Sequence, residues 1–190
     1  MQTGMKLKAF YNKPFFKDGR FILYLWIAIS VFMGIFNSLT GRLHNNYKIY
    51  KYVFLNIIEQ FPLYQHRPQS FDDVNHYGPV FGVIMAPFAL MPDLIGATLW
   101  LVFLAMVLYF AVKELPLKPW QHLAILLICT NSMIIAQTNV QFNTATAALI
   151  ILSYAFIRKE KDCWAAFMIM LGTFVKLYGI VGFDFFFFSK

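Results

Sequence analysis

Charged residues are scarce in this chain, at 13% of 190 residues, whereas about a quarter is usual in soluble domains. Apolar residues make up 59%, and several apolar runs reach the roughly 20 residues that cross a bilayer core. These values exclude a soluble globular domain and predict a multi-pass membrane protein. The sixteen basic residues outnumber the nine acidic ones and gather at the ends of the apolar runs. They serve there as orientation signals, so we expect membrane lipids and no nucleic acid as partners.

Cysteine is also rare. Cys129 and Cys163 lie in or beside apolar segments and lack CxxC spacing, so we expect neither a disulfide nor a structural metal site. No cofactor is expected, although a divalent metal stays open because the adjacent carboxylates of Asp72 and Asp73 could bind one. The chain also lacks internal repeats, and its first apolar run has no small-residue cleavage pattern, so it is expected to remain as an anchor.

Five apolar segments are predicted to span the membrane in a single membrane domain, residues 1–190. They are residues 21–39, 95–112, 120–137, 144–157 and 164–176. The first span follows a basic flank, residues 1–20, that the positive-inside rule keeps in the cytoplasm. The chain stops at Lys190 with a last apolar segment barely complete. We therefore interpret it as the N-terminal portion of a longer protein or a truncated reading frame.

A polar and aromatic loop, residues 40–94, separates the first two spans. Apolar residues recur there at helical spacing from Leu43 to Phe61, which predicts an amphipathic helix lying in the membrane interface. Residues 79–92 are apolar, but roughly 14 residues would cover only about 21 Å as a helix, short of a core near 30 Å. We expect this segment to be re-entrant or interfacial.

The distribution of basic residues favours an arrangement in which residues 79–92 do not cross. Eleven basic residues then lie on the cytoplasmic side and five outside, whereas a crossing segment would place six inside and ten outside. The positive-inside rule prefers the first arrangement. In it, the loop, the polar turn 137–143 and residues 176–178 all reach the outer face. Because polar groups at membrane depth are unfavourable, this convergence indicates a functional site.

Four short motifs follow one another along the chain. They are Tyr77-Gly78-Pro79-Val80-Phe81, Ala86-Pro87-Phe88, Gln141-Phe142-Asn143 and Lys176-Leu177-Tyr178-Gly179. In this order they resemble glycosyltransferase family 87, the polyprenyl-phosphate-mannose-dependent enzymes of the GT-C fold, over most of residues 21–188. The resemblance implies an all-α, polytopic membrane helix bundle of GT-C type with an interfacial or re-entrant outer loop. It also implies a place in the bacterial plasma (inner) membrane, with the N-terminus in the cytoplasm.

The same resemblance implies a mannosyltransferase reaction: the inverting transfer of a hexose, with mannose favoured, from a polyprenyl-phosphate-linked donor to an unknown glycan or lipid acceptor. Such chemistry needs a carboxylate to deprotonate the acceptor hydroxyl and cations to stabilise the departing phosphate. Asp72 and Asp73 are the candidate catalytic carboxylates. The candidate phosphate-binding residues are Lys176, Arg67 and His76. The candidate residues for binding the sugar or the acceptor are Asn46, Tyr47, Tyr77, Gln141, Asn143 and Tyr178.

Each candidate also has a structural interpretation. Asp72 and Asp73 can be solvated loop acids, Lys176 can extend toward the lipid headgroups, and Asn143 can cap the helix that follows. The general-base aspartate of the family would fall at Asn45 or Asn46, where an amide cannot accept a proton as a carboxylate does. This departure supports one alternative, a non-catalytic carrier of lipid-linked sugars or accessory membrane subunit. The stop at Lys190 leaves another alternative, an inactive fragment.

Overall fold

A computed structural model describes residues 20–43 and 45–187 of the chain. The described residues form helices joined by loops and contain no β-strand. The all-α membrane helix bundle expected from the sequence is therefore confirmed. The predicted cytoplasmic flank lies outside the described residues except for its last member, Arg20, and so does the end of the last apolar run.

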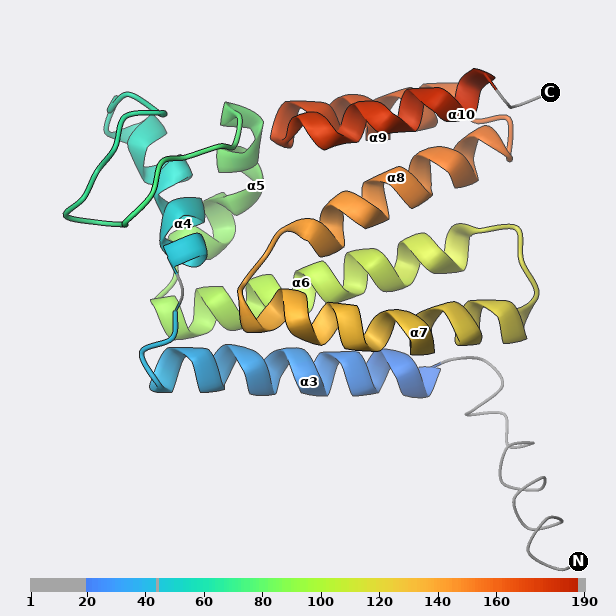
Figure 1. Ribbon diagram of the computed structural model, residues 1–190, viewed down its shortest axis with the longest axis horizontal. Helices are drawn as coiled ribbons and strands as arrows, with labels where there is room; N and C mark the ends of the chain where they lie inside the picture. The colour runs from blue at the N-terminus through green and yellow to red at the C-terminus, as the bar shows by residue number, and fades with distance from the viewer. Residues whose placement is uncertain (1–19, 44, 188–190) are drawn as a thin grey trace, which may run out of the picture.

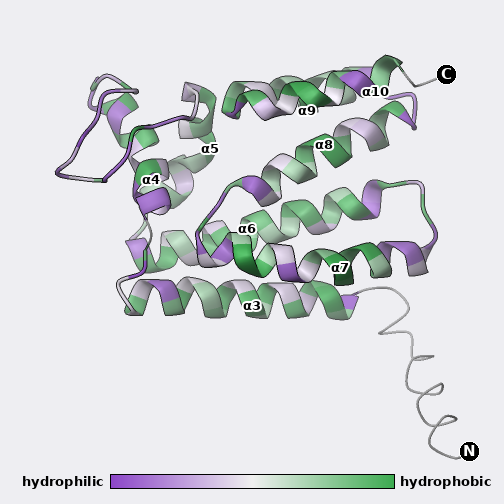
Figure 2. Ribbon diagram, viewed as in Figure 1, coloured by the Kyte–Doolittle hydropathy of each residue, from purple (hydrophilic) through white to green (hydrophobic). Residues whose placement is uncertain are grey.

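Five helices lie side by side and alternate in direction along the bundle (Figure 1). Three of them are long and apolar enough to cross a membrane: α3 (Arg20–Leu39), α6 (Asp93–Glu114) and α7 (Pro119–Thr138). The other two, α8 (Asn143–Ile157) and α9 (Asp162–Val175), have 15 and 14 residues. Helices of that length cover only about 22 Å, so two of the five predicted spans are shorter than a typical bilayer core. Hydrophilic residues gather at the helix ends and in the loops (Figure 2).

Polar side chains join α3 to α7 inside this apolar bundle. The Trp26 indole donates to the Thr130 hydroxyl at 3.0 Å. The Gln137 amide donates to Ser30 Oγ at 2.7 Å, and Asn37 donates to the Gln137 carbonyl at 3.3 Å. Hydrogen bonds of this kind contribute about 0.6–2 kcal/mol each between membrane helices. They fix the register of the two helices.

Two shorter helices, α4 (Asn45–Ile58) and α5 (Pro79–Ala89), cover one end of the bundle, which we call the capped end (Figure 1). Helix α3 ends and helix α6 begins at this end. Helix α4 occupies the middle of the predicted amphipathic stretch. Helix α5 has only 11 residues and packs so closely on α4 that a Cβ atom on Gly82 would lie 2.5 Å from the Ile57 side chain. The chain therefore leaves α3 and enters α6 at the same end of the bundle.

Beyond α9 the chain folds back on itself. The 3-10 helix η1 (Leu177–Phe183) and the short helix α10 (Asp184–Phe187) run back along α9. The return is close because it is built on glycines: a Cβ atom on Gly179 would meet the backbone of Gly172 and Thr173. Lys176 lies between α9 and η1, at the tip of the resulting hairpin, with an extended backbone (φ −157°, ψ 132°).

Candidate functional site

Three polar segments that are distant in sequence meet at the capped end. Asn46 Nδ2 donates to the Asn139 carbonyl at 2.8 Å, which joins the start of α4 to the turn between α7 and α8. The Gly78 N–H donates to the Val175 carbonyl at 3.2 Å, which joins the long loop to the end of α9. The loop, the α7–α8 turn and the tip of the α9–η1 hairpin therefore form one structural unit.

An open cleft of about 470 Å³ lies within this unit, next to Lys176. The residues that line this Lys176 cleft come from the loop after α4 and from the hairpin tip. They are Tyr64, Asn75, His76, Lys176, Leu177 and Tyr178. The volume falls in the range of about 300–1,000 Å³ that small-molecule sites occupy. Three of the residues proposed from sequence, His76, Lys176 and Tyr178, are thus brought together.

Lys176 is held by aromatic rings rather than by an acid. Its ammonium nitrogen lies 5.3 Å from the centre of the Tyr77 ring and 5.1 Å from the centre of the Tyr178 ring. Cation–π contacts at partly exposed sites contribute about 0.5–1 kcal/mol. Among the residues that the structure describes, Lys176 has no carboxylate partner. Its charge therefore stays available to an anion that enters the cleft.

The Tyr77 ring, over which the Lys176 ammonium lies, is held in a fixed position. Asn75 accepts the Tyr77 N–H at 2.9 Å and donates to the Tyr77 carbonyl at 2.8 Å, so one buried amide holds both sides of the Tyr77 backbone. The Tyr77 ring stacks on Phe81, with 4.5 Å between ring centres. These contacts leave the position of Tyr77 little freedom.

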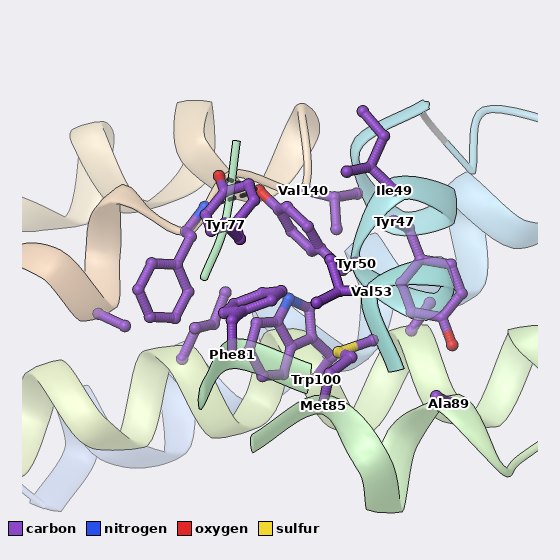
Figure 3. Packing of buried hydrophobic residues seen from close by; sticks show 14 of the residues in the cluster. Tyr47, Ile49, Tyr50, Val53, Tyr77, Phe81, Met85, Ala89, Trp100 and Val140 are labelled. Carbon is purple, nitrogen blue, oxygen red and sulfur yellow. Dashed lines mark hydrogen bonds between the residues drawn. The ribbon is translucent and has the colours of Figure 1, made fainter. Parts of the chain in front are cut away.

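Tyr50 connects Tyr77 to the α7–α8 turn. Its hydroxyl accepts the Phe142 N–H at 3.2 Å and lies 3.2 Å from the Tyr77 hydroxyl. Figure 3 shows the Tyr50 side chain among Tyr77, Phe81 and Trp100, whose rings pack edge to face against it. Burial raises the pKa of the Tyr50 hydroxyl well above its ordinary value, so this group remains protonated and able to donate.

Arg67, a predicted phosphate ligand, lies outside the lining of the cleft. Its guanidinium donates to Asn56 Oδ1 and to the Glu59 carboxylate, both at 2.7 Å. The guanidinium carbon also lies 4.9 Å from the Tyr52 ring centre and 5.0 Å from that of Phe61. Arg67 thereby ties the loop to the end of α4.

The two predicted catalytic carboxylates also lie outside the lining of the cleft. Asp72 and Asp73 are exposed. The Asp72 N–H donates to Asn45 Oδ1 at 2.7 Å, and Asp73 Oδ1 accepts the Val74 N–H at 2.7 Å. Within residues 20–43 and 45–187, no group of three or more His, Cys, Asp and Glu side chains is placed to hold a metal ion.

The remaining candidates differ in accessibility. Asn46 is engaged by Asn139, and the Tyr47 ring is fully buried at 0% exposure, with its hydroxyl 3.5 Å from the Phe88 carbonyl. The Tyr47 ring therefore presents no free surface to a sugar, and Asn46 is partly buried. Tyr178, in contrast, is 59% exposed at the cleft.

Gln141 and Asn143 form an amide pair beside the capped end. Asn143 Nδ2 donates to Gln141 Oε1 at 3.0 Å. Helix α8 has Phe142 as its N-cap residue and no side-chain cap bond, so Asn143 does not cap this helix. The pair leaves the Gln141 N–H₂ group and the Asn143 carbonyl oxygen for other partners.

Sequence reasoning missed three residues that line the cleft, Tyr64, Asn75 and Leu177. The position of Asn75 two residues before Tyr77 carries a usable signal, because an Asn side chain commonly binds the backbone two residues onward. Tyr64 carries no such signal, since it lies in a loop without periodic pattern.

The sequence profile of glycosyltransferase family 87 matches residues 75–190, more than half of the chain. The match includes the buried Tyr77, the Gln141–Asn143 pair and the hairpin tip with Lys176. Neither a curated protein nor a solved structure matches the chain. The chain therefore belongs to glycosyltransferase family 87, and it is a membrane glycosyltransferase.

Proposed function

We propose that the protein transfers a hexose, mannose in the first instance, from a polyprenyl-phosphate-linked donor to a glycan or lipid acceptor at the outer face of the membrane. The observation that carries this proposal is the ammonium of Lys176, which lies in a cleft at one end of the bundle and has no carboxylate partner among the described residues. A lipid-linked donor presents its phosphate at the membrane surface while its chain stays among the lipids. The Lys176 ammonium, at the end of apolar helices, suits such a group. The proposed architecture is of the GT-C type.

The role of Lys176 follows from the chemistry of the transfer. The acceptor oxygen attacks the anomeric carbon, and the bond from that carbon to the phosphate oxygen breaks. Negative charge therefore accumulates on the departing polyprenyl phosphate. An ammonium group already in position stabilises this charge more strongly in a partly buried cleft than in water. Tyr77 and Tyr178 hold that ammonium in place.

Side chains at the capped end suit a sugar, although of these only Tyr178 lines the cleft, and Gln141 and Asn143 lie outside its lining. The exposed ring of Tyr178 offers an apolar face to the C–H groups of a hexose. Gln141 and Asn143 offer free amide groups to sugar hydroxyls. In the proposed orientation, the N-terminus is cytoplasmic and the capped end faces the outside of a bacterial plasma membrane.

A second candidate function, carriage of a lipid-linked sugar without chemistry, rests on a different observation. No carboxylate lines the Lys176 cleft among the described residues, and Asn45 and Asn46 stand where the family resemblance places an aspartate. A carrier would bind the donor and release it unchanged.

Donor consumption separates the two functions. The protein would be reconstituted in phospholipid vesicles with radiolabelled polyprenyl-phosphate-mannose and a panel of alkyl glycosides and membrane glycolipids. We expect the label to move to an acceptor and free polyprenyl phosphate to appear. Saturable donor binding with no consumption across the panel would instead establish the carrier.

A further inference from the structure

The lining of the Lys176 cleft contains few groups able to accept a proton. Its side chains are two tyrosines, an asparagine, a leucine, Lys176 and His76. Lysine and tyrosine ordinarily hold their protons near neutral pH, and an amide or an alkyl group has no suitable basic site. Histidine is the side chain that ordinarily exchanges a proton between pH 5 and 8. His76 is thus the basic group that the described lining supplies.

The nearby carboxylates are less well placed. Asp72 and Asp73 do not line the cleft, and their stretch of loop is bonded to Asn45 at the start of α4. Glu59, the acid that precedes them along the chain, forms an ion pair with Arg67 at 2.7 Å. Asn45 itself is an amide and cannot serve as a base.

The backbone on either side of His76 is well fixed. Asn75 holds the Tyr77 backbone through two hydrogen bonds, and Gly78 is bonded to Val175 at the end of α9. His76 lies between these anchors, and its side chain is exposed in the cleft. The adjacent residue, Tyr77, lies under the Lys176 ammonium. The loop therefore delivers an imidazole to the same cleft that holds the cation.

We propose that His76 is the general base of the transfer, an inference that rests on the proposed function. An unprotonated ring nitrogen of His76 takes the proton of the acceptor hydroxyl while the acceptor oxygen forms its bond to the anomeric carbon. The carbon–oxygen bond to the phosphate breaks, and its electron pair leaves with the polyprenyl phosphate beside Lys176. The imidazolium then returns its proton to solvent. His76 thus acts on the acceptor hydroxyl and Lys176 on the departing phosphate, from separate elements that line the same cleft.

A general base and a phosphate ligand predict opposite effects of pH on the reaction, and the sequence suggested the role of phosphate ligand for His76. A base acts when it is unprotonated, so kcat/KM for the donor would rise with pH and then level off. An imidazolium that binds phosphate acts when protonated, so donor KM would rise with pH.

Other titratable or charged groups around His76 can also contribute to the pH dependence. They are Lys176, Tyr64, Tyr77 and Tyr178 at the cleft, and Asp72 and Asp73 in the loop. The Arg67–Glu59 pair lies between the loop and the end of α4, and the Lys51–Asp93 pair joins α4 to the start of α6.

The test compares His76→Gln with wild type from pH 5 to 9. Consumption of radiolabelled polyprenyl-phosphate-mannose is measured with the best acceptor from the panel. We expect kcat to fall by about 10²–10⁴-fold, donor KM to change little, and the rise of kcat/KM with pH to disappear. His66→Gln is the matched control, because His66 is an exposed histidine of the same loop that does not line the cleft. It should retain wild-type kcat and pH profile.

Three results would overturn the inference. The first is a His76→Gln variant that keeps the kcat and pH profile of wild type. The second is a His76→Gln variant in which only donor KM rises, as expected of a phosphate ligand. The third is loss of the pH-dependent rise in Asp72→Asn or Asp73→Asn but not in His76→Gln, which would identify a carboxylate base. Absence of donor consumption by wild type across the whole panel would remove the proposed function first and His76 with it. The two failures are therefore distinguishable.

Discussion

The ammonium nitrogen of Lys176 lies 5.3 Å from the centre of the Tyr77 ring, although 98 residues separate the two along the chain. The contact exists because Gly78 has no side chain, which lets the loop approach α9 closely. A Cβ atom at this position would collide with the Phe174 carbonyl. The Gly78 N–H instead bonds to the adjacent Val175 carbonyl. A short Tyr-Gly-Pro sequence therefore supplies both an aromatic surface and the close approach that brings Lys176 onto it.

Removal of the Lys176 charge should impair donor use without unfolding the protein. Lys176→Met keeps an unbranched apolar side chain, and no described carboxylate loses a partner. We expect kcat/KM for polyprenyl-phosphate-mannose to fall by about 10²-fold or more, which corresponds to about 2.7 kcal/mol of transition-state stabilisation. Lys48→Met, an exposed lysine on α4, is the matched control. Equal effects of the two variants would show that the Lys176 charge has no special role.

Tyr50→Phe should weaken both the fold and the reaction. Loss of the hydroxyl leaves the buried Phe142 N–H without its acceptor and removes the link to the Tyr77 hydroxyl. An unsatisfied buried group of this kind destabilises a protein by about 1–3 kcal/mol. Thermal unfolding in detergent measures the loss, with Tyr24→Phe as the control because Tyr24 is 61% exposed on α3. An unchanged melting temperature would mean that the network does not hold the capped end together.

The helices were well predicted from sequence because apolar runs and prolines mark their limits. Helix α6 follows Pro92 and helix α7 begins at Pro119, as expected of a residue that lacks an N–H to donate. The contacts of the site were less predictable. Arg67 and Lys176 are both basic residues near aromatic ones in sequence. Arg67 nevertheless pairs with Glu59, eight residues away, whereas Lys176 pairs with no acid in the part of the chain that the structure describes. Pairing of this kind depends on the path of an irregular loop, which hydrophobic periodicity does not encode.

The path of the loop also limits how well the proposed general base could be predicted from sequence. Sequence favoured Asp72 and Asp73 because transfer chemistry uses carboxylates and these lie near Tyr77. The fold of the loop directs its polar groups differently: it brings His76 into the Lys176 cleft and holds Asp72 at Asn45. Asp73 and His76 are close in sequence, but in an irregular loop this closeness does not determine which side chain reaches the cleft.

Arg67→Met should affect the loop more than donor binding. The substitution removes the bonds to Asn56 and Glu59 and leaves a buried Asn56 oxygen without its partner. We expect faster cleavage by protease within residues 59–78, together with a smaller rise in donor KM than Lys176→Met causes. Limited proteolysis followed by mass spectrometry locates the cleavage. A rise in donor KM equal to that of Lys176→Met would instead support Arg67 as a phosphate ligand.

Gly179→Ala should displace the hairpin tip. The added Cβ atom meets the backbone of Gly172 and Thr173, which cannot rotate away as a flexible side chain could. We expect a lower melting temperature and a loss of turnover, since Lys176 precedes Gly179 by three residues. Gly41→Asn is the control: its position is open, and Asn tolerates the left-handed conformation there (φ +69°). A stable and active Gly179→Ala variant would contradict the close return along α9.

The most direct test of the whole account is the sidedness of the capped end. Single cysteines at Lys48, Thr138 and Tyr178, all exposed, would be placed in a background with Cys129→Ala and Cys163→Ala and treated with an impermeant thiol reagent on intact cells. We predict labelling of all three from outside. Cys163, exposed at the start of α9, would be retained alone as the control and should react only after the cells are opened. If Thr138→Cys or Tyr178→Cys reacted only in opened cells, the α7–α8 turn or the hairpin tip would lie across the membrane from the loop, and the proposed outer-face site would be wrong.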